Sequence, residues 1–87
     1  MPEISRFYGI IIKMYFADHL PPHFHAEYGD FKAQISITTG DIIEGKLPIK
    51  QLKLVQAWII LHEEEILENF NSLRKDPATW VTIEPLR

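Results

Sequence analysis

The sequence contains no cysteine in its 87 residues, so a disulfide framework, a thiolate nucleophile and cysteine metal ligands are all excluded. It also has no apolar run near the ~20 residues that a membrane-spanning helix requires. The N-terminus does not resemble a signal peptide, because one basic residue precedes an apolar run that Lys13 interrupts. We therefore expect a protein of the reducing cytoplasm that has no membrane partner.

Positive charge and phosphate-binding motifs are scarce as well. The net charge is −3, which gives no general attraction to nucleic acid or to an anionic membrane surface. The basic residues are dispersed, apart from Lys46, Lys50 and Lys53 at the start of the helix predicted below, and no glycine-rich phosphate loop is present. RNA is therefore a weakly supported partner.

The composition is nevertheless that of a folded protein. Hydrophobic residues make up 46% of the chain and aromatic residues 11%, which is too apolar for a disordered segment. A chain of this length forms one domain, here residues 1–87, and buries only about 60–65% of the surface that its unfolded form exposes. A partner surface, including a second copy in a homodimer, would add useful stability.

Residues 7–16, Phe-Tyr-Gly-Ile-Ile-Ile-Lys-Met-Tyr-Phe, are rich in aromatic and β-branched side chains and predict one strand. Both alternating faces are largely apolar, which is typical of a central strand covered on both sides. We expect the even-numbered side chains from Tyr8 to Phe16 to point to the main core. Ile11, Lys13 and Tyr15 then lie on the more open face.

Residues 23–38 have the clearest pattern in the chain, that of a β-hairpin. Gly29-Asp30 is a suitable two-residue turn, because glycine tolerates the positive φ that such a turn needs. The turn pairs apolar residues on one face, namely Phe24 with Ile35, Ala26 with Ala33 and Tyr28 with Phe31. It pairs polar residues on the other, namely His23 with Ser36, His25 with Gln34 and Glu27 with Lys32. A shift by one residue destroys both patterns, so this register is well defined.

The second half of the chain reads as a helix between two short strands. Proline at 48 and apolar residues in steps of three and four predict a helix from Pro48 to about Leu73, with a possible break at Glu63–Glu65. Its apolar stripe is widened by Trp58, Leu61 and Leu67. Residues 42–46 predict an edge strand and residues 80–86 a terminal strand. The fold class is thus α+β, a two-layer antiparallel sheet of about four strands plus a short C-terminal strand, packed against one long helix.

Three of the four histidines lie between residues 19 and 25, around a stiff Pro21-Pro22 pair. His23 and His25 are two apart on a strand, so their side chains leave the same face. His19 precedes them in a loop and can fold back, which would make His19, His23 and His25 a metal site with an open position. The alternatives are an acid–base or anion-binding site without a metal, and two ordinary surface histidines. No organic cofactor is expected.

A second candidate pair lies on the helix, where His62 and Glu65 are three residues apart and therefore neighbours. A carboxylate beside an imidazole raises its basicity and sets its tautomer, although a half-buried structural histidine fits equally well. In an enzyme, the catalytic groups would be His23, His25, His62 and Glu65. The ligand-binding groups would be Lys13, Tyr15, His19 and Lys32. The helix should cover the sheet face opposite His23 and His25, so a single site uniting them with His62 is not expected.

With these residues in view, the chain resembles a small bacterial family, the domain-of-unknown-function family forty-one-sixty. The resemblance rests on Pro2-Glu3-Ile4-Ser5, Tyr8-Gly9, Asp18-His19, the motif Pro21-Pro22-His23-Phe24-His25-Ala26, Leu47-Pro48, His62 and Ile83-Glu84-Pro85-Leu86. It implies no particular reaction. It does imply a context, because members are often encoded beside another small uncharacterised domain, in an arrangement like a toxin–antitoxin pair.

Two functions are therefore expected from the sequence. The first is that of a bacterial protein acting through a cognate small protein encoded nearby, as one half of a toxin–antitoxin-like pair. The second is that of a small ribonuclease-like or metal-dependent hydrolase that uses the histidine cluster, which needs a base or activated water, an acid and a cation near the reacting bond.

Overall fold

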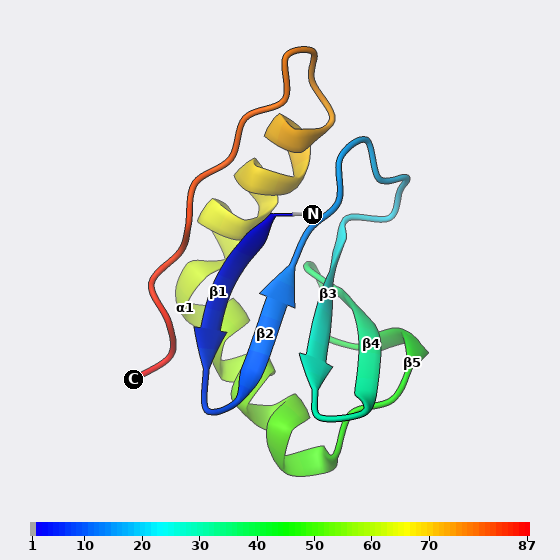
Figure 1. Cartoon of the computed structure of the whole chain (residues 1–87), viewed down its shortest axis with the longest axis vertical. Helices are drawn as coiled ribbons and strands as arrows, with labels where there is room; N and C mark the ends of the chain where they lie inside the picture. The colour runs from blue at the N-terminus through cyan, green and yellow to red at the C-terminus, as the bar shows by residue number, and fades with distance from the viewer. Residues whose placement is uncertain (1) are drawn as a thin grey trace.

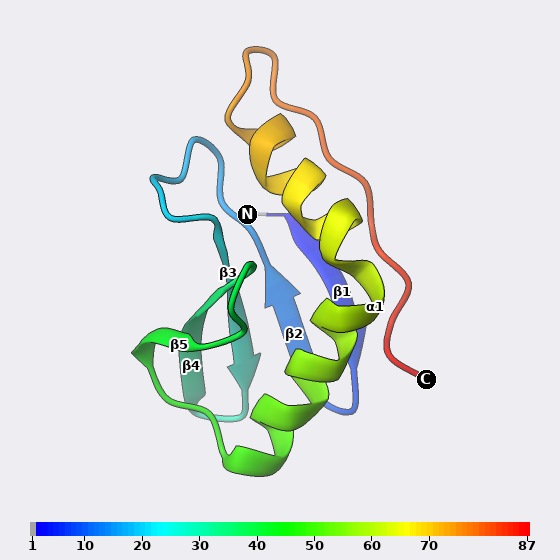
Figure 2. The same ribbon diagram turned by 180° about the vertical axis from the view of Figure 1, so that it is seen from behind.

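A five-stranded antiparallel meander and one long helix form the two layers of the structure, a computed structural model that describes residues 2–87. The strands follow one another in the order β1 to β5, and Figures 1 and 2 show α1 lying across one face of the sheet. The elements are β1 (Glu3–Phe7), β2 (Ile10–Lys13), β3 (His23–Tyr28), β4 (Phe31–Ser36), β5 (Ile42–Gly45) and α1 (Ile49–Leu73). The predicted α+β class is confirmed.

The N-terminal strand prediction is wrong, because the chain turns back at Tyr8-Gly9. Both residues have positive φ, 49° at Tyr8 and 79° at Gly9, and Phe7 pairs with Ile10 on either side of them. This is the backbone that a two-residue hairpin turn requires, although tyrosine seldom adopts it. Tyr8, in the turn, is 59% exposed and Phe16, beyond the end of β2, is 50% exposed, so neither faces the core. The predicted inward direction of Ile10, Ile12 and Met14 is confirmed. The hairpin also supplies the strand that brings the sheet to five.

The second hairpin is confirmed residue by residue. Every predicted pair forms across β3 and β4, from His23 opposite Ser36 to Tyr28 opposite Phe31. Gly29 has a φ of 56°, as its place in the turn demands. One detail differs, since Phe31 sits beside the turn at the end of the sheet and is 42% exposed. Burial against the helix begins only with Ala33 and Ile35.

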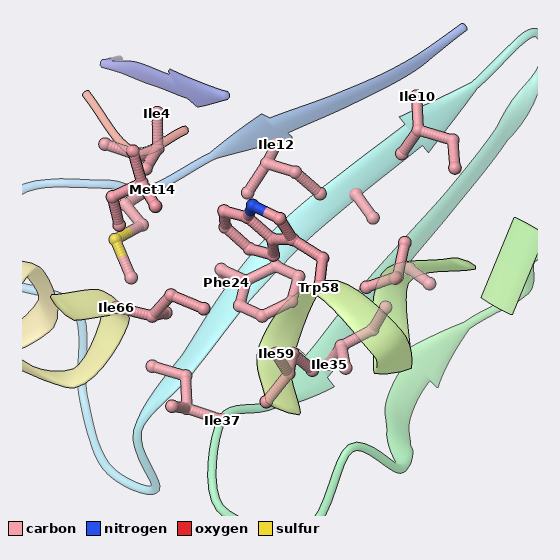
Figure 3. Packing of buried hydrophobic residues seen from close by; sticks show 14 of the residues in the cluster. Ile4, Ile10, Ile12, Met14, Phe24, Ile35, Ile37, Trp58, Ile59 and Ile66 are labelled. Atoms are coloured by element: carbon pink, nitrogen blue, oxygen red, sulfur yellow. The ribbon is translucent and has the colours of Figure 1, made fainter. Parts of the chain in front are cut away.

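The core lies between α1 and the covered face of the sheet, and Trp58 is at its centre (Figure 3). Its indole ring packs against Phe7 and Phe24 at centroid separations of 5.4 and 5.6 Å. Aliphatic side chains from the strands and the helix complete the layer, among them Ile4, Ile10, Ile12, Met14, Ile35, Ile37, Ile59 and Ile66.

The helix begins one residue after Pro48 and ends at Leu73, so the predicted range is confirmed. Its backbone leaves helical geometry at His62, where φ is −134° and ψ is 20°, one residue before the predicted break. Leu61 is 65% exposed and does not belong to the buried stripe. Within residues 2–87, no helix is long and apolar enough to cross a membrane.

The predicted terminal strand does not form, although the segment is extended. Figure 1 shows it running beside α1 and β1. Asn69 holds Val81 by two hydrogen bonds, of 2.6 Å to its carbonyl oxygen and 3.0 Å from its N–H. The Trp58 indole N–H donates to the Glu84 carbonyl oxygen (2.8 Å), and the Ile83 N–H donates to the Ile4 carbonyl oxygen (2.9 Å). Helix side chains thus provide most of the partners that a strand ladder would have supplied.

Candidate functional site

The connection between β2 and β3 folds over the end of the sheet and carries Asp18 to the first residues of β3. Its course is tied to the helix, because the Ala17 N–H donates to the carbonyl oxygen of Leu73, the last residue of α1 (3.1 Å). Figure 1 shows this connection at the same end of the molecule as the C-terminal turns of α1. Asp18 is thereby held in place although it lies in a loop.

Asp18, His23 and His25 converge on one point. One carboxylate oxygen, Oδ2 of Asp18, lies 3.1 Å from Nε2 of His23 and 3.3 Å from Nε2 of His25. One nitrogen from each imidazole and a carboxylate oxygen all lie within 4.8 Å of one another. The two rings are 5.3 Å apart between centroids. Because alternate residues of a strand share a face, the His-x-His spacing places both imidazoles where one carboxylate can reach them.

His23 is almost fully buried, at 3% exposure. Its Nδ1–H donates to the carbonyl oxygen of Pro21 at 2.8 Å, and its ring lies 5.8 Å from that of Phe70 in α1. The alternative that His23 is an ordinary surface histidine is therefore wrong, as is a position remote from the helix. The reason is that β3 begins at His23, where Pro21 and Asp18 of the β2–β3 connection and Phe70 of α1 contact its ring.

His25 remains partly accessible, and the Tyr15 ring stands edge-on to it at 4.1 Å. Burial lowers the pKa of the His25 imidazole below its ordinary value of 6.5. The hydrogen bond and the negative charge of Asp18 oppose that shift without cancelling it. The neutral imidazole, which can accept a proton or bind a metal ion, is thus favoured near neutral pH.

His25 also lines a pocket of about 240 Å³ on the sheet face that the helix does not cover. The other polar side chains around this pocket are Tyr15, Glu27, Lys32, Gln34 and Glu44. Lys13 lies beside it and forms an ion pair with Glu27 at 3.3 Å. Of the predicted ligand-binding residues, Tyr15 and Lys13 therefore lie next to His25, and Lys32 lines the same pocket.

His62 and Glu65 lie outside this cluster, and His19 lies at its exposed edge. The His19 side chain is 89% exposed, with its Nδ1 3.8 Å from the other Asp18 oxygen and its ring centroid 6.0 Å from that of His23. Asp18 thus takes the place that the sequence interpretation assigned to His19. On the helix, His62 and Glu65 form the expected pair, with Nδ1 and Oε1 2.9 Å apart. The His62 ring lies 6.1 Å from that of Trp58, measured between centroids, and it belongs to a different part of the surface.

Sequence reasoning missed Asp18 as a member of the site. The available signal was a carboxylate at one end of a proline-containing connection whose other end carries two histidines at strand spacing. That pattern shows proximity along the chain, whereas the position of the carboxylate depends on how the connection folds against the helix.

Comparison with known proteins identifies the family. Residues 9–71 match the family model described as "domain of unknown function (DUF4160)". No curated protein and no solved structure matches the chain. Because the family match covers more than half of the sequence, the protein belongs to the DUF4160 family, as its resemblance to that family indicated.

Proposed function

We propose that this protein is a small hydrolase in which Asp18, His23 and His25 activate the attacking water. The observation that carries the proposal is the convergence of two imidazoles and one carboxylate at the edge of a polar pocket. Such a group can remove a proton from water directly, or hold a cation that does so. Lys32, which lines the same pocket, is placed to balance negative charge that develops on the substrate.

The pocket indicates the size and charge of the substrate. At about 240 Å³ it is smaller than the ~300–1,000 Å³ of sites for drug-sized ligands. Its lining contains two carboxylates and one ammonium group, from Glu27, Glu44 and Lys32. This balance, together with the net charge of −3, disfavours a polyanion such as a long stretch of RNA and favours a small polar ester that carries little negative charge.

The proposal is tested with purified protein on a phosphomonoester, a phosphodiester, a carboxylic ester and a short RNA. Asp18→Asn keeps the shape of the side chain but removes its charge, and His25→Gln removes the imidazole. Each is expected to lower kcat/KM by about 10²–10⁴-fold, the usual contribution of a positioned acid or base. Asp30→Asn, in the exposed turn between β3 and β4, is the matched control.

Two results would contradict this assignment. One is a wild-type chain that turns over none of the four substrates. The other is activity that survives both Asp18→Asn and His25→Gln. If Glu65→Gln alone removes the activity, the reaction takes place at the His62–Glu65 pair on the helix.

A second candidate function is binding of a small protein encoded nearby, as one half of a toxin–antitoxin-like pair. An exposed aromatic pair favours it. Phe16 and Trp80 stack edge to face at 5.7 Å, yet they remain 50% and 43% exposed. Large aromatic side chains of this kind are frequent anchors of protein interfaces. Since Phe16 is two residues from Asp18, a partner on this pair would lie beside the β2–β3 connection that carries Asp18.

Partner binding is tested by co-expressing the neighbouring gene and measuring the affinity of the purified proteins. Phe16→Ala and Trp80→Ala are expected to weaken the complex by at least about 30-fold each, since anchor residues cost about 2 kcal/mol or more on truncation. Ile60→Ala, at a helix position that is 78% exposed, is the control and should bind normally. Affinities equal to that of the wild type for all three variants would place any interface elsewhere on the protein.

A further inference from the structure

We propose that Asp18, His23 and His25 bind a divalent first-row transition-metal ion, Zn²⁺ in the first instance, through Oδ2 of Asp18 and Nε2 of each imidazole. The inference rests on the proposed hydrolase for its biological role, since a bound ion would then activate the water. Its geometry stands independently of that role, as the following distances and contacts show.

The spacing of the donor atoms fits one ion. Zn²⁺ binds imidazole nitrogen and carboxylate oxygen at about 2.0–2.2 Å, so ligand atoms that share a tetrahedral ion lie roughly 3.2–3.6 Å apart. The Asp18 oxygen is 3.1 Å from Nε2 of His23 and 3.3 Å from Nε2 of His25. Small adjustments of the side chains bring all three atoms, which already lie within 4.8 Å of one another, onto one centre.

The hydrogen bond at the far side of the His23 ring strengthens the case. A carbonyl oxygen can only accept, so the 2.8 Å contact with Pro21 puts a proton on Nδ1. In the neutral ring Nε2 is then a bare acceptor, and it faces a carboxylate oxygen, which is a second acceptor, at 3.1 Å. A positive charge between Nε2 of His23 and the Asp18 oxygen removes the repulsion between these two acceptors. Metal-bound histidines show the same arrangement, with the remaining N–H donated to a backbone carbonyl.

The surroundings suit a reactive ion more than a purely structural one. Three protein ligands leave at least one coordination position for water, as in catalytic zinc sites and in the two-histidine, one-carboxylate sites of iron enzymes. His23 is buried, whereas the side chains of Asp18 and His25 are each 17% exposed. The ion would therefore be anchored from the inside and reached by solvent from the outside, next to the pocket that His25 lines.

The competing explanation is a latch in which a proton, with no metal ion, joins Asp18 to the two histidines and holds the β2–β3 connection in place. The two explanations differ in one measurable property. A latch has no affinity for Zn²⁺ beyond that of any exposed histidine, and it leaves Co²⁺ in its six-coordinate aqueous form. A three-ligand site binds one ion per chain and changes the visible spectrum of Co²⁺.

The experiment uses the full-length chain without a histidine tag, stripped with a chelator and then titrated with Zn²⁺ by calorimetry and with Co²⁺ by visible absorption. One ion per chain is expected, with the stronger absorption of four- or five-coordinate Co²⁺. Asp18→Asn and His25→Gln should each weaken binding by at least about 100-fold, beyond the ~10–100-fold cost of losing an outer partner. His62→Gln, which breaks the other histidine–carboxylate pair, is the matched control and should bind as the wild type does.

The proposal is overturned if wild-type protein leaves Co²⁺ with its aqueous spectrum, or if both cluster variants bind Zn²⁺ as tightly as the His62→Gln control. Circular dichroism of each metal-free variant checks its folding, and a variant that is unfolded is replaced by Asp18→Ala or His25→Asn, which also remove the ligand. Metal binding without hydrolysis would contradict the proposed hydrolase activity but not the proposed metal site. Hydrolysis that persists in excess chelator would show that the ion takes no part in the reaction, while the Zn²⁺ and Co²⁺ titrations alone decide whether the site binds it.

Discussion

Replacing Trp58 with alanine is expected to lower the free energy of unfolding by about 3–5 kcal/mol, the usual cost of deleting a large aromatic side chain from a core. The indole is fully buried and lies between Phe7 of β1 and Phe24 of β3. Its N–H also holds the C-terminal segment through Glu84. Loss of this one side chain therefore opens a cavity between the two layers and releases a segment that covers the edge of the sheet.

The second tryptophan provides the control. Trp80→Ala removes the same chemical group from a position that is 43% exposed, so its cost should be about 1 kcal/mol or less. Urea unfolding followed by circular dichroism compares both variants without depending on tryptophan fluorescence. A third variant, Trp58→Phe, refills part of the cavity without the N–H donor and should lie between them. Equal losses for Trp58→Ala and Trp80→Ala would contradict the packing described above.

Gly45→Ala is expected to cost about 2–5 kcal/mol, from two causes that add at one residue. Gly45 has a φ of 86°, which disfavours every residue with a side chain. A Cβ atom there would overlap the Lys32 carbonyl oxygen and lie 3.0 Å from Cα of Ala33. The variant must therefore push β5 away from β4 and weaken the hydrogen bond that the Lys46 N–H donates to the same Lys32 oxygen.

Gly29→Ala separates the two causes. Gly29 also has a positive φ, of 56°, but no atom beyond its chain neighbours lies within 4 Å of the position that the alanine methyl group would take. Only the backbone cost remains, about 1–2 kcal/mol. Chemical unfolding of both variants gives the difference directly. If Gly29→Ala proves as damaging as Gly45→Ala, the close approach of β5 to β4 does not contribute.

Local pattern accounts for what could be predicted. The hairpin of β3 and β4 was predictable because the turn at Gly29-Asp30 and two complementary faces agree on a single register. The helix was predictable because apolar residues, with His62 filling one gap, repeat in steps of three and four from Val55 to Leu73. In both elements, residues close in the sequence determine the structure.

The wrong predictions concern segments whose structure depends on contacts with residues far away in the sequence. The Tyr8-Gly9 turn was hidden because a tyrosine at positive φ is unfavourable by itself, and it is stabilised here by a hairpin whose strands pack against the helix. Residues 80–86 have the composition of a strand, yet Asn69 and Trp58 of the helix supply the hydrogen bonds. Strand propensity cannot distinguish these partners from a neighbouring strand.

The sequence by itself determined the α+β class, the long helix, the register of one hairpin and the common origin of His23 and His25 on one strand, since each depends on short-range periodicity. Only the tertiary structure decided that Asp18 completes the cluster and that His23 is buried, whereas the separation of His62 was already expected from the two faces of the sheet. Those two outcomes depend on how the connection between β2 and β3 meets the end of the helix. Contacts between distant segments are set by the packing of the whole chain, and no local pattern encodes them.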